Sequence, residues 1–466
     1  MQLKNKTEKT ICAIATSLNN NSIGIIRISG PEAISITQKI FKTKNKKEID
    51  ISQSHKVYYG FVFFNDEIID EVICLTMRAP KSYTKEDVVE IHSHGSQNVL
   101  QKILELLLDN GATLAEAGEF TKRAFLNGRI DLSKAEAVID IINSQTDYQR
   151  KAAISQLTGN IENKINSYRE EILNATAYIE AALDDPEHIS LDNYKYELKN
   201  TIIKIKNEIQ TIISNYQNGK IIKEGINTVI LGKPNVGKSS LLNTLLGENR
   251  AIVTDIAGTT RDTIKESINI DGLLLNIIDT AGIREINEDN NVEKIGINKA
   301  IEEATNADLI IYLLDINKDL NEDFSLKDKD INIIEKFKNK KIIYLLNKSD
   351  LLQNKITKKI KDNQILFSTI TKEGLNELKT MIKDLFISRD INFNNQIFIN
   401  NERQLESFKQ AKNSLENVLT SINKNVSEDF YTIDLMDSYN FLSQIIGKDI
   451  SEDLINQIFS KFCMGK

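Results

Sequence analysis

Hydrophobic and polar residues change their spacing along the chain, and this change divides it into parts. Up to about residue 124, short hydrophobic runs alternate with polar positions and predict β-strands, with one helical pattern among them. The predicted strands are Gly24–Ile28, Val57–Phe64, Val72–Met77 and Val88–Ile91, and the predicted helix is Val99–Asp109. This mixture predicts an N-terminal α+β domain over residues 1–124.

Residues 125–221 carry a helical pattern instead. From Ile154 to Leu183, hydrophobic residues recur at three- and four-residue spacing with only one glycine. The same spacing returns after residue 385, through Gln404–Leu419 and Asp434–Ile446. We therefore expect helices in both stretches.

Between these helical stretches, residues 222–384 alternate hydrophobic strands with helices. This alternation is typical of a parallel sheet with right-handed crossovers. The simplest arrangement is an all-α helical domain, built from residues 125–221 and 385–466, that is interrupted by an inserted α/β domain. Such an insertion needs chain ends that lie close together.

The inserted domain begins with a phosphate-loop motif at Gly232–Ser239, with the sequence GKPNVGKS. It follows the strand Thr228–Leu231 and precedes the helix Ser240–Leu246, the context that separates a true phosphate loop from a chance match. Backbone amides of such a loop wrap a phosphate, while Lys238 can reach the β- and γ-phosphates and Ser239 can bind Mg²⁺. A glycine-rich turn is the alternative, but a turn alone requires neither lysine nor serine.

Two further motifs predict that the nucleotide is guanine. Asp279–Gly282 (DTAG) follows the hydrophobic run Leu273–Ile278, and its aspartate can reach Mg²⁺ through water. Asn347–Asp350 (NKSD) ends another strand, and the carboxylate of Asp350 can accept hydrogen bonds from both N1 and N2 of guanine. Adenine lacks this donor pair. Ser368–Ile370 lies where such GTPases carry a small-residue loop near the base, although its usual form is Ser-Ala.

Two residues distinguish this motif set from that of Ras-like enzymes. Ile283 directly follows DTAG, where Ras-like enzymes place a glutamine that orients the attacking water. Isoleucine cannot form a hydrogen bond through its side chain, so either hydrolysis is slow or another group positions the water. Asn235 lies inside the phosphate loop, and its amide oxygen, with nearby backbone carbonyls, could hold a monovalent cation between the β- and γ-phosphates. A turn-stabilising asparagine is the alternative.

With these motifs, the chain resembles the MnmE (TrmE) family of tRNA-modification GTPases. The resemblance is carried by GTTRD at Gly258–Asp262, the isoleucine after DTAG, and FCMGK at Phe462–Lys466. Three nearly verbatim family motifs in the first part of the chain are Arg27–Gly30, Ser82–Glu90 and Gly118–Arg129. The resemblance covers essentially the whole chain and implies that the inserted domain is a Ras-like G domain.

The resemblance implies a potassium-activated GTPase whose G domains pair in a homodimer. It implies Lys238 and Glu293 as catalytic residues, with Glu293 organising the water in place of glutamine; a solvated glutamate at a helix start is the alternative. The implied Mg²⁺ ligands are Ser239 and Thr260, and the implied K⁺ ligands are Asn235, Thr254, Ile256 and Thr259. The residues expected to bind GTP are Asn235, Val236, Gly237, Lys238, Ser239, Ser240, Thr254, Asp255, Ile256, Ala257, Gly258, Thr259, Thr260, Asp279, Thr280, Ala281, Gly282, Asn347, Lys348, Ser349, Asp350, Ser368, Thr369 and Ile370.

In this family the N-terminal domain binds a reduced folate, 5-formyl- or 5,10-methylene-tetrahydrofolate, as a one-carbon donor. The matching positions are Arg27, Glu90, Arg129 and Lys466. Guanidinium and ammonium groups suit the folate carboxylates, and a carboxylate suits the amino-imino edge of the pterin. A surface ion pair is the alternative for each residue taken alone. The family's glycine-rich stretch before Arg27 is replaced by the asparagine-rich Ser17–Ser22, and Cys463 is the candidate functional cysteine.

The function implied by the resemblance is modification of tRNA coupled to GTP hydrolysis. With a flavin-dependent MnmG-type partner in a heterotetramer, the enzyme would add a carboxymethylaminomethyl or aminomethyl group at C5 of the wobble uridine 34. An Era-like ribosome-assembly GTPase is the alternative, but residues 385–466 do not resemble the basic RNA-binding module that such a protein carries after its G domain. A membrane-associated GTPase would need a membrane segment or a basic amphipathic face, and the sequence offers neither.

Composition adds limits on partners and compartment. The 466 residues include 59 Lys and Arg against 66 Asp and Glu, a net charge of −7, so a tRNA partner must use a local basic patch or a basic partner subunit. Three cysteines argue against a disulfide framework and fit a reducing cytoplasm. We expect Cys12 and Cys74, which lie in hydrophobic runs, to be small core residues. The polar start of the chain is not a signal peptide, and we expect a cytoplasmic protein.

Overall fold

A computed structural model describes most of the chain. The described residues are 9–17, 21–45, 48–50, 53–191, 194–249, 266–278, 302–321, 326–327, 330–331, 334–352, 362–387, 396–448, 450–462 and 465. The chain divides into two compact units. The first contains Met1–Ile139, Ile161–Glu180 and Leu435–Lys466, and the second contains Asp140–Asn160 and Ala181–Asp434.

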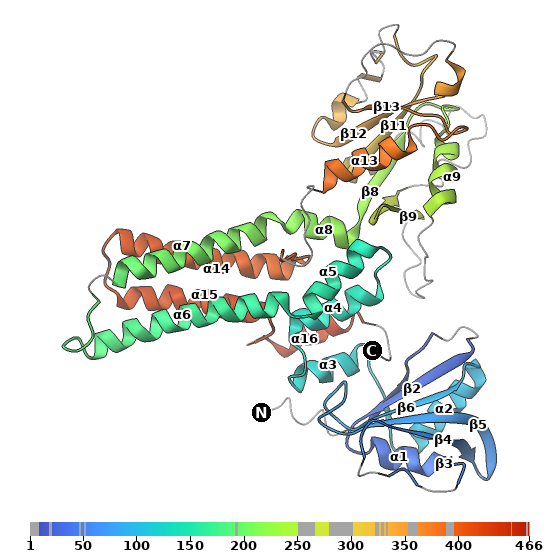
Figure 1. Ribbon diagram of the computed structural model, residues 1–466, viewed down its shortest axis with the longest axis vertical. Helices are drawn as coiled ribbons and strands as arrows, with labels where there is room; N and C mark the ends of the chain where they lie inside the picture. The colour runs from blue at the N-terminus through green and yellow to red at the C-terminus, as the bar shows by residue number, and fades with distance from the viewer. Residues whose placement is uncertain are drawn as a thin grey trace. The chain divides into compact units, whose positions relative to one another are not determined.

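A seven-stranded sheet forms the N-terminal part of the first unit, in the order β3-β4-β5-β6-β2-β1-β7 (Figure 1). Its strands are β1 (Ile11–Ile14), β2 (Ile23–Ser29), β3 (Phe41–Thr43), β4 (Lys56–Phe64), β5 (Glu67–Met77), β6 (Val88–His94) and β7 (Thr113–Leu114). Neighbouring strands are antiparallel except β1 and β7, which are parallel. The four predicted strands are confirmed, and β5 begins five residues before the predicted Val72 because polar residues at its start concealed it from the hydrophobic pattern.

Helices α1 (Ala33–Ile40) and α2 (Gln97–Asp109) cover one face of this sheet. The alternation of the strands decides which residues enter this core: Ile26 and Ile28 are fully buried, and Arg27 between them points to the other face. Cys12 and Cys74 are buried in the same unit and form no disulfide. Their predicted role as small core residues is confirmed.

The remaining helices of the first unit include α3 (Glu119–Leu126), α4 (Leu132–Ile142) and α16 (Glu452–Phe459). A small hydrophobic core joins them through Leu132, Ala135, Ile455, Phe459 and Phe462. Late residues of the chain therefore belong to the same compact unit as the N-terminal sheet.

The helical run predicted from Ile154 to Leu183 is in fact two helices. These are α5 (Asp147–Leu157) and α6 (Asn160–Asp184), and Gly159 between them has a φ of +92°. A left-handed backbone is accessible to glycine at little cost, so this residue ends one helix and starts the next. The helical pattern predicted over Ile154–Leu183 is confirmed, and the turn at Gly159 divides it into two helices.

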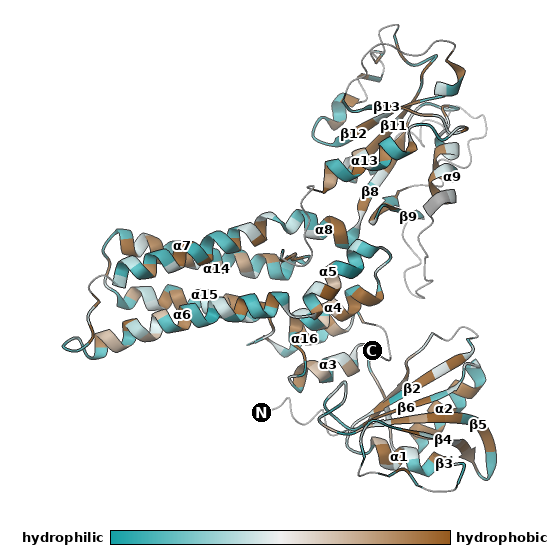
Figure 2. Cartoon of the chain, viewed as in Figure 1, coloured by the Kyte–Doolittle hydropathy of each residue, from teal (hydrophilic) through white to brown (hydrophobic). Residues whose placement is uncertain are grey.

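Helices α7 (Tyr194–Ser214) and α14 (Glu402–Asn423) of the second unit lie side by side (Figure 1). Figure 2 shows hydrophilic and hydrophobic residues interspersed along both helices, as the amphipathic pattern predicts. The buried residues of α7 are spaced by three or four: Leu198, Ile202, Ile205, Ile209 and Ile212. A further helix, α15 (Asp429–Ile445), follows α14.

The two chain connections to the inserted domain are in direct contact. The domain is entered through α8 (Tyr216–Glu224) and left through residues 396–400. A Cβ atom on Gly219 of α8 would lie 2.2 Å from the carbonyl oxygen of Ile399. This close approach satisfies the geometric requirement of a domain inserted into a helical one.

The inserted domain contains a six-stranded sheet in the order β13-β12-β11-β8-β10-β9. Its strands are β8 (Ile226–Leu231), β9 (Glu266–Ile270), β10 (Leu273–Ile277), β11 (Leu309–Asp315), β12 (Lys341–Asn347) and β13 (Gln364–Leu366). All neighbouring pairs are parallel except the hairpin of β9 and β10. Helices α9 (Lys238–Asn249) and α13 (Leu375–Phe386) pack on one face of the sheet.

This architecture confirms the predicted fold class: an α+β N-terminal domain, and an all-α helical domain interrupted by a Ras-like G domain with a parallel sheet. The domain limits at residues 124, 221 and 384 stay predictions. Within the part of the chain that the structure describes, no helix is both long and hydrophobic enough to cross a bilayer.

Candidate nucleotide site and N-terminal polar site

The phosphate loop connects the end of β8 to the first residue of α9, Lys238. The Lys238 ammonium group donates hydrogen bonds to the carbonyl oxygens of Gly232 and Lys233, both at 2.8 Å. Ser239 and Ser240 are exposed in the first turn of α9, and Asn235 is exposed at the top of the loop. The loop therefore ends at a helix N-terminus that carries a lysine and two exposed serines, the groups that phosphate and Mg²⁺ binding require.

Asn347, at the end of β12, links the phosphate loop to the predicted base-binding loops. Its side-chain amide donates to the carbonyl oxygen of Val236 at 2.7 Å, and its side-chain oxygen accepts from the backbone amide of Thr369 at 3.3 Å. A Cβ atom on Gly237 would lie 2.4 Å from the Asn347 amide nitrogen, and the φ of Gly237 is +105°. Glycine is therefore required beside this bond.

Ser368 positions the carboxylate that is expected to recognise guanine. Its buried hydroxyl donates to Asp350 Oδ1 at 2.6 Å and accepts from the backbone amides of Ile370 and Thr371. Asp350 itself is exposed, and Ile370 is 80 % exposed. The loop whose sequence departs from Ser-Ala thus keeps the serine that makes this contact, and Ile370 extends away from it.

Lys348 of the same motif has a φ of +68° and pairs with a residue that the sequence pattern did not single out. Its ammonium group lies 2.7 Å from Asp315 Oδ2, at the end of β11. Burial pushes the pKa of Asp315 upward, but hydrogen bonds from Lys348 and from the Asn317 amide outweigh this effect and hold the pKa below its usual value. Asp315 could have been found as a polar residue ending a hydrophobic strand at the carboxyl edge of the sheet.

The second site lies on the exposed face of the N-terminal sheet. Arg27 of β2 is directly opposite Glu90 of β6, and Arg27 Nε lies 2.8 Å from Glu90 Oε1. Both side chains are less than one-fifth exposed. The Arg27 guanidinium also donates to the carbonyl oxygen of Gly465, at 3.2 Å. The structure therefore brings together the Arg27 and Glu90 side chains and the end of the chain.

Aromatic rings complete the surroundings of Arg27. Its guanidinium carbon is 5.8 Å from the centre of the Tyr83 ring and 5.6 Å from that of Phe120. The guanidinium carbon of Arg129 lies 4.8 Å from the same Tyr83 ring. The Tyr83 ring thus lies beside two guanidinium groups, and its electron-rich face attracts each of them. Tyr83 lies within the motif Ser82–Glu90, but no residue pattern in the sequence indicates a role for its ring.

Phe462 and Gly465 are held close to this site by packing. Phe462 is buried beside Gly118 at the start of α3. At Gly465, a Cβ atom would lie 2.5 Å from the carbonyl oxygen of Ile14 in β1. These contacts seat the end of the chain beside β1 and Arg27.

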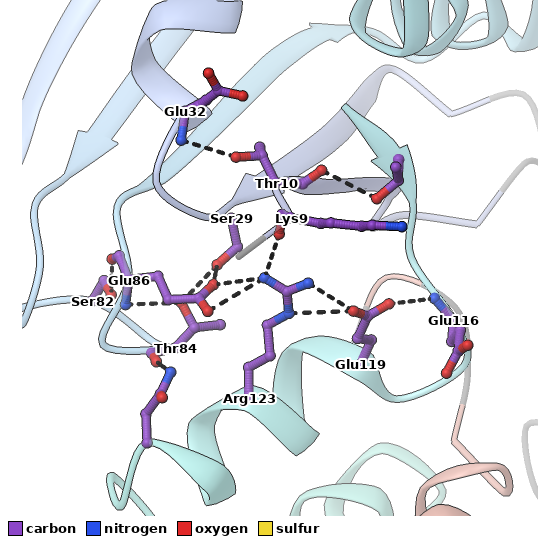
Figure 3. A network of polar contacts seen from close by, with 12 residues as sticks. Lys9, Thr10, Ser29, Glu32, Ser82, Thr84, Glu86, Glu116, Glu119 and Arg123 are labelled. Atoms are coloured by element: carbon purple, nitrogen blue, oxygen red, sulfur yellow. Dashed lines mark hydrogen bonds and ion pairs between the residues drawn. The ribbon is translucent and has the colours of Figure 1, made fainter. Parts of the chain in front are cut away.

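A neighbouring network of buried charges fixes α3 to the sheet (Figure 3). Arg123 is 3 % exposed and pairs with Glu86 and Glu119 at 3.2 and 2.8 Å. Ser29 donates to Glu86, and Arg123 also donates to the carbonyl oxygen of Lys9. Because these partners surround the guanidinium, this network serves the fold and holds the motif Gly118–Arg129 in place.

Comparisons with known proteins identify the family of the chain. A family model described as MnmE helical domain matches residues 132–463, and one described as GTP-binding protein TrmE N-terminus matches residues 10–129. The tRNA modification GTPase MnmE of Lachnoclostridium phytofermentans is 50 % identical over 462 residues, which cover 98 % of this chain and 99 % of the relative. The chain belongs to the MnmE family. The tRNA modification GTPase MnmE of Clostridioides difficile is 44 % identical over 465 residues, which cover 98 % of this chain and 99 % of that relative.

Two solved structures are similar to part of this chain. A variant of Aquifex aeolicus Era bound to GDP·AlF4⁻ is 26 % identical, with a TM-score of 0.27, over 41 % of this chain and 66 % of that one. The G domain of the T. maritima FeoB iron transporter is 24 % identical, with a TM-score of 0.22, over 34 % of this chain and 97 % of that one. Membership of the MnmE family makes this chain a GTP-binding GTPase of the tRNA-modification class.

Several predicted site residues of this MnmE chain lie outside the described residues. They are Thr254, Asp255, Ile256, Ala257, Gly258, Thr259, Thr260, Asp279, Thr280, Ala281, Gly282, Ile283, Glu293, Cys463 and Lys466. The described phosphate-loop, NKSD and Ser368–Ile370 residues are brought together at the carboxyl edge of one sheet. Arg27 and Arg129 both lie beside the Tyr83 ring, and Glu90 pairs with Arg27. Among the described residues, no group of three or more His, Cys, Asp or Glu could hold a metal ion.

Proposed function

We propose that this MnmE-family chain is a potassium-activated GTPase that helps to modify the wobble uridine of certain tRNAs. The observation that carries the proposal is that one chain contains two separate sites of different chemistry. One is a guanine-nucleotide site whose loops are joined by hydrogen bonds through Asn347, and the other is lined by arginine and glutamate. A GTPase switch alone has no need of the second site. The two sites together fit an enzyme that couples nucleotide hydrolysis to the transfer of a small group.

At the nucleotide site, each described residue has a role that its position supports. Asp350, oriented by Ser368, accepts the N1 and N2 hydrogens of guanine, and Asn347 holds the base-binding loops against the phosphate loop. Lys238 neutralises the β- and γ-phosphates. Ser239 and Thr260 would hold Mg²⁺, which supplies charge neutralisation at the same phosphates. The exposed hydroxyl of Ser239 in the first turn of α9 fits this role.

Hydrolysis needs a group that replaces the missing glutamine. Asn235, Thr254, Ile256 and Thr259 would hold K⁺, which neutralises charge that develops between the phosphates. The exposed amide of Asn235 at the top of the phosphate loop fits such a ligand. Glu293 would orient the attacking water, since Ile283 cannot. Pairing of two G domains in a homodimer would complete the site.

The N-terminal site suits a reduced folate. Arg27 and Arg129 are cations beside the Tyr83 ring, and together they can bind the carboxylates of a glutamyl tail, with Lys466 as a third cation. Glu90 can accept hydrogen bonds from the amino-imino edge of a pterin, as it now does from Arg27. The reduced folate supplies a one-carbon unit. Cys463 would lie within two residues of Gly465, whose carbonyl oxygen contacts Arg27.

The full reaction requires further components. A flavin-dependent MnmG-type protein would form a heterotetramer with the homodimer. The pair would add a carboxymethylaminomethyl or aminomethyl group at C5 of uridine 34. The proposed domains are residues 1–124 for folate binding, residues 125–221 with 385–466 for the helical domain, and residues 222–384 for the G domain.

Mass spectrometry of tRNA nucleosides tests this function. Cells that lack the protein should lose the modified wobble uridine, and the wild-type gene should restore it. We expect the Arg27→Ala variant to fail to restore it while still hydrolysing GTP, because Arg27 lies outside the G domain. An unchanged wobble uridine in the deletion strain would refute the proposal.

Two binding and rate measurements test its parts. Calorimetry with 5-formyltetrahydrofolate should give heat with the wild type and much less with Arg27→Ala; no heat with the wild type would remove the one-carbon role. GTP hydrolysis should be faster in K⁺ than in Na⁺, and Glu293→Ala should slow it with little loss of GTP affinity. Equal rates in the two salts would refute the K⁺ role.

A further inference from the structure

Lys233, the second residue of the phosphate loop, makes contacts that the nucleotide-binding motif does not require. Its ammonium group lies 2.8 Å from Asp319 Oδ1 and 2.9 Å from Asp330 Oδ2. Both carboxylates lie in the segment after β11, 86 and 97 residues further along the chain. The motif G-x-x-x-x-G-K-[ST] accepts any residue at this position.

The two carboxylates are themselves held in place. Asp330 is fully buried and accepts a hydrogen bond from the Tyr312 hydroxyl at 2.9 Å, and burial together with this bond raises the pKa of Tyr312. Asp319, 9 % exposed, accepts from the backbone amide of Asp315 at 2.9 Å. Asp315 in turn pairs with Lys348 of the NKSD motif. Lys233 therefore ties the phosphate loop to the end of β11, which is also tied to the base-binding loop.

The backbone of Lys233 is part of the phosphate-binding machinery. The Lys238 ammonium group donates to the carbonyl oxygens of Lys233 and Gly232. Pro234 follows and restricts the backbone of Lys233 to extended conformations. The proline limits the backbone conformation of Lys233. The ion pairs of the Lys233 side chain join this part of the phosphate loop to the segment after β11.

The geometry points to Lys233 as a positioning residue for nucleotide binding. Its side chain, held by Asp319 and Asp330, keeps the first half of the phosphate loop and the seat of Lys238 in the binding conformation before the nucleotide arrives. This inference rests on the proposed assignment of the phosphate loop. A loop that must be ordered on binding loses affinity, because the ordering entropy is then subtracted from the binding free energy.

The test is a titration of the full-length protein with fluorescent GDP. We expect Lys233→Met to weaken GDP binding about tenfold, the scale of one charge-assisted hydrogen bond. Lys233→Arg, which can still reach both carboxylates, should stay within about threefold of the wild type. Lys233→Met that binds GDP as the wild type does, or Lys233→Arg that loses as much as Lys233→Met, would overturn the inference.

Two further variants separate positioning from stability. The Lys223→Met control removes a half-buried lysine that lies 2.9 Å from Asp140, away from the phosphate loop, and should leave GDP affinity unchanged. The double variant Lys233→Met with Asp330→Asn removes the buried charge that Lys233→Met leaves behind. We expect it to regain melting temperature but not GDP affinity.

If the double variant regained GDP affinity as well, Lys233 would act only through stability and the inference would be wrong. A wild-type protein that bound no GDP would instead remove the phosphate-loop assignment. The two failures are therefore distinguishable.

Discussion

Removal of the Ser368 hydroxyl should test how base recognition is built. The hydroxyl donates to Asp350 Oδ1 at 2.6 Å, and Asp350 is exposed while Ser368 is fully buried. A hydrogen bond to a charged group contributes about 1.5–3 kcal/mol, and the exposure of Asp350 favours the lower limit because water can replace part of the bond. We therefore expect Ser368→Ala to weaken GDP binding about tenfold.

Inosine diphosphate makes the measurement specific, because hypoxanthine keeps N1–H but lacks the 2-amino group of guanine. The wild type should prefer GDP over inosine diphosphate, since Asp350 accepts from both donors of guanine. In Ser368→Ala the carboxylate is free to rotate, so this preference should fall by roughly threefold or more, about half of one such hydrogen bond. Calorimetric titration of both nucleotides against both proteins gives the four affinities that are needed.

A buried serine elsewhere provides the control. Ser414 of α14 is buried and donates to the Gln410 carbonyl oxygen at 3.2 Å, far from the NKSD motif in sequence. Ser414→Ala should change neither affinity, because this hydroxyl bonds only within its own helix. If Ser368→Ala bound GDP as tightly as the wild type, with the same preference over inosine diphosphate, the role given to this hydroxyl would be refuted.

Three other outcomes follow from features of the two units. The pKa of Asp315 is lowered in the folded protein, so its carboxylate stabilises the fold above about pH 4, and this stabilisation is lost as pH falls through the folded pKa. In urea unfolding, Asp315→Asn should have a lower free energy of unfolding at neutral pH, and this free energy should fall less between neutral and acidic pH than in the wild type. Burial raises the pKa of Cys12 to about 12 and raises that of Cys74 as well, so both should resist iodoacetamide at pH 8 until the chain unfolds; rapid labelling of the native protein would contradict this. Gly465→Ala should displace the end of the chain from Arg27 and weaken 5-formyltetrahydrofolate binding without altering GDP affinity, which calorimetry with both ligands would show.

Local patterns predicted the elements of the fold well where burial controls them. Alternation around Arg27 placed Ile26 and Ile28 in the core, because a strand with one covered face must alternate. The break at Gly159 escaped the helical pattern, since hydrophobic spacing continues across it and only the left-handed backbone reveals the turn. Periodicity reports which face is buried, not whether the helix axis is continuous.

The candidate sites were predictable only as far as each motif is contiguous. The phosphate loop and the NKSD motif have fixed internal spacings, so the sequence identifies them directly. The pairs Lys348–Asp315 and Lys233–Asp330 join residues that are 33 and 97 positions apart in the sequence. The sequence around one partner therefore does not predict which residue the other partner is. Likewise, the contact of Arg27 with Gly465 spans 438 positions, and the family resemblance implied only that Arg27 and Lys466 share a folate site.

The close contact between α8 and residues 396–400 constrains how the G domain can move. The helix carrying Gly219 touches the Ile399 backbone, so a movement of one connection along the other would have to break this contact. A methyl group at residue 219 would push the two connections apart by about an ångström, given a 2.2 Å approach that must widen to an ordinary contact. Gly219, which has no side-chain carbon, thus allows the two connections of the inserted domain to pack directly against each other.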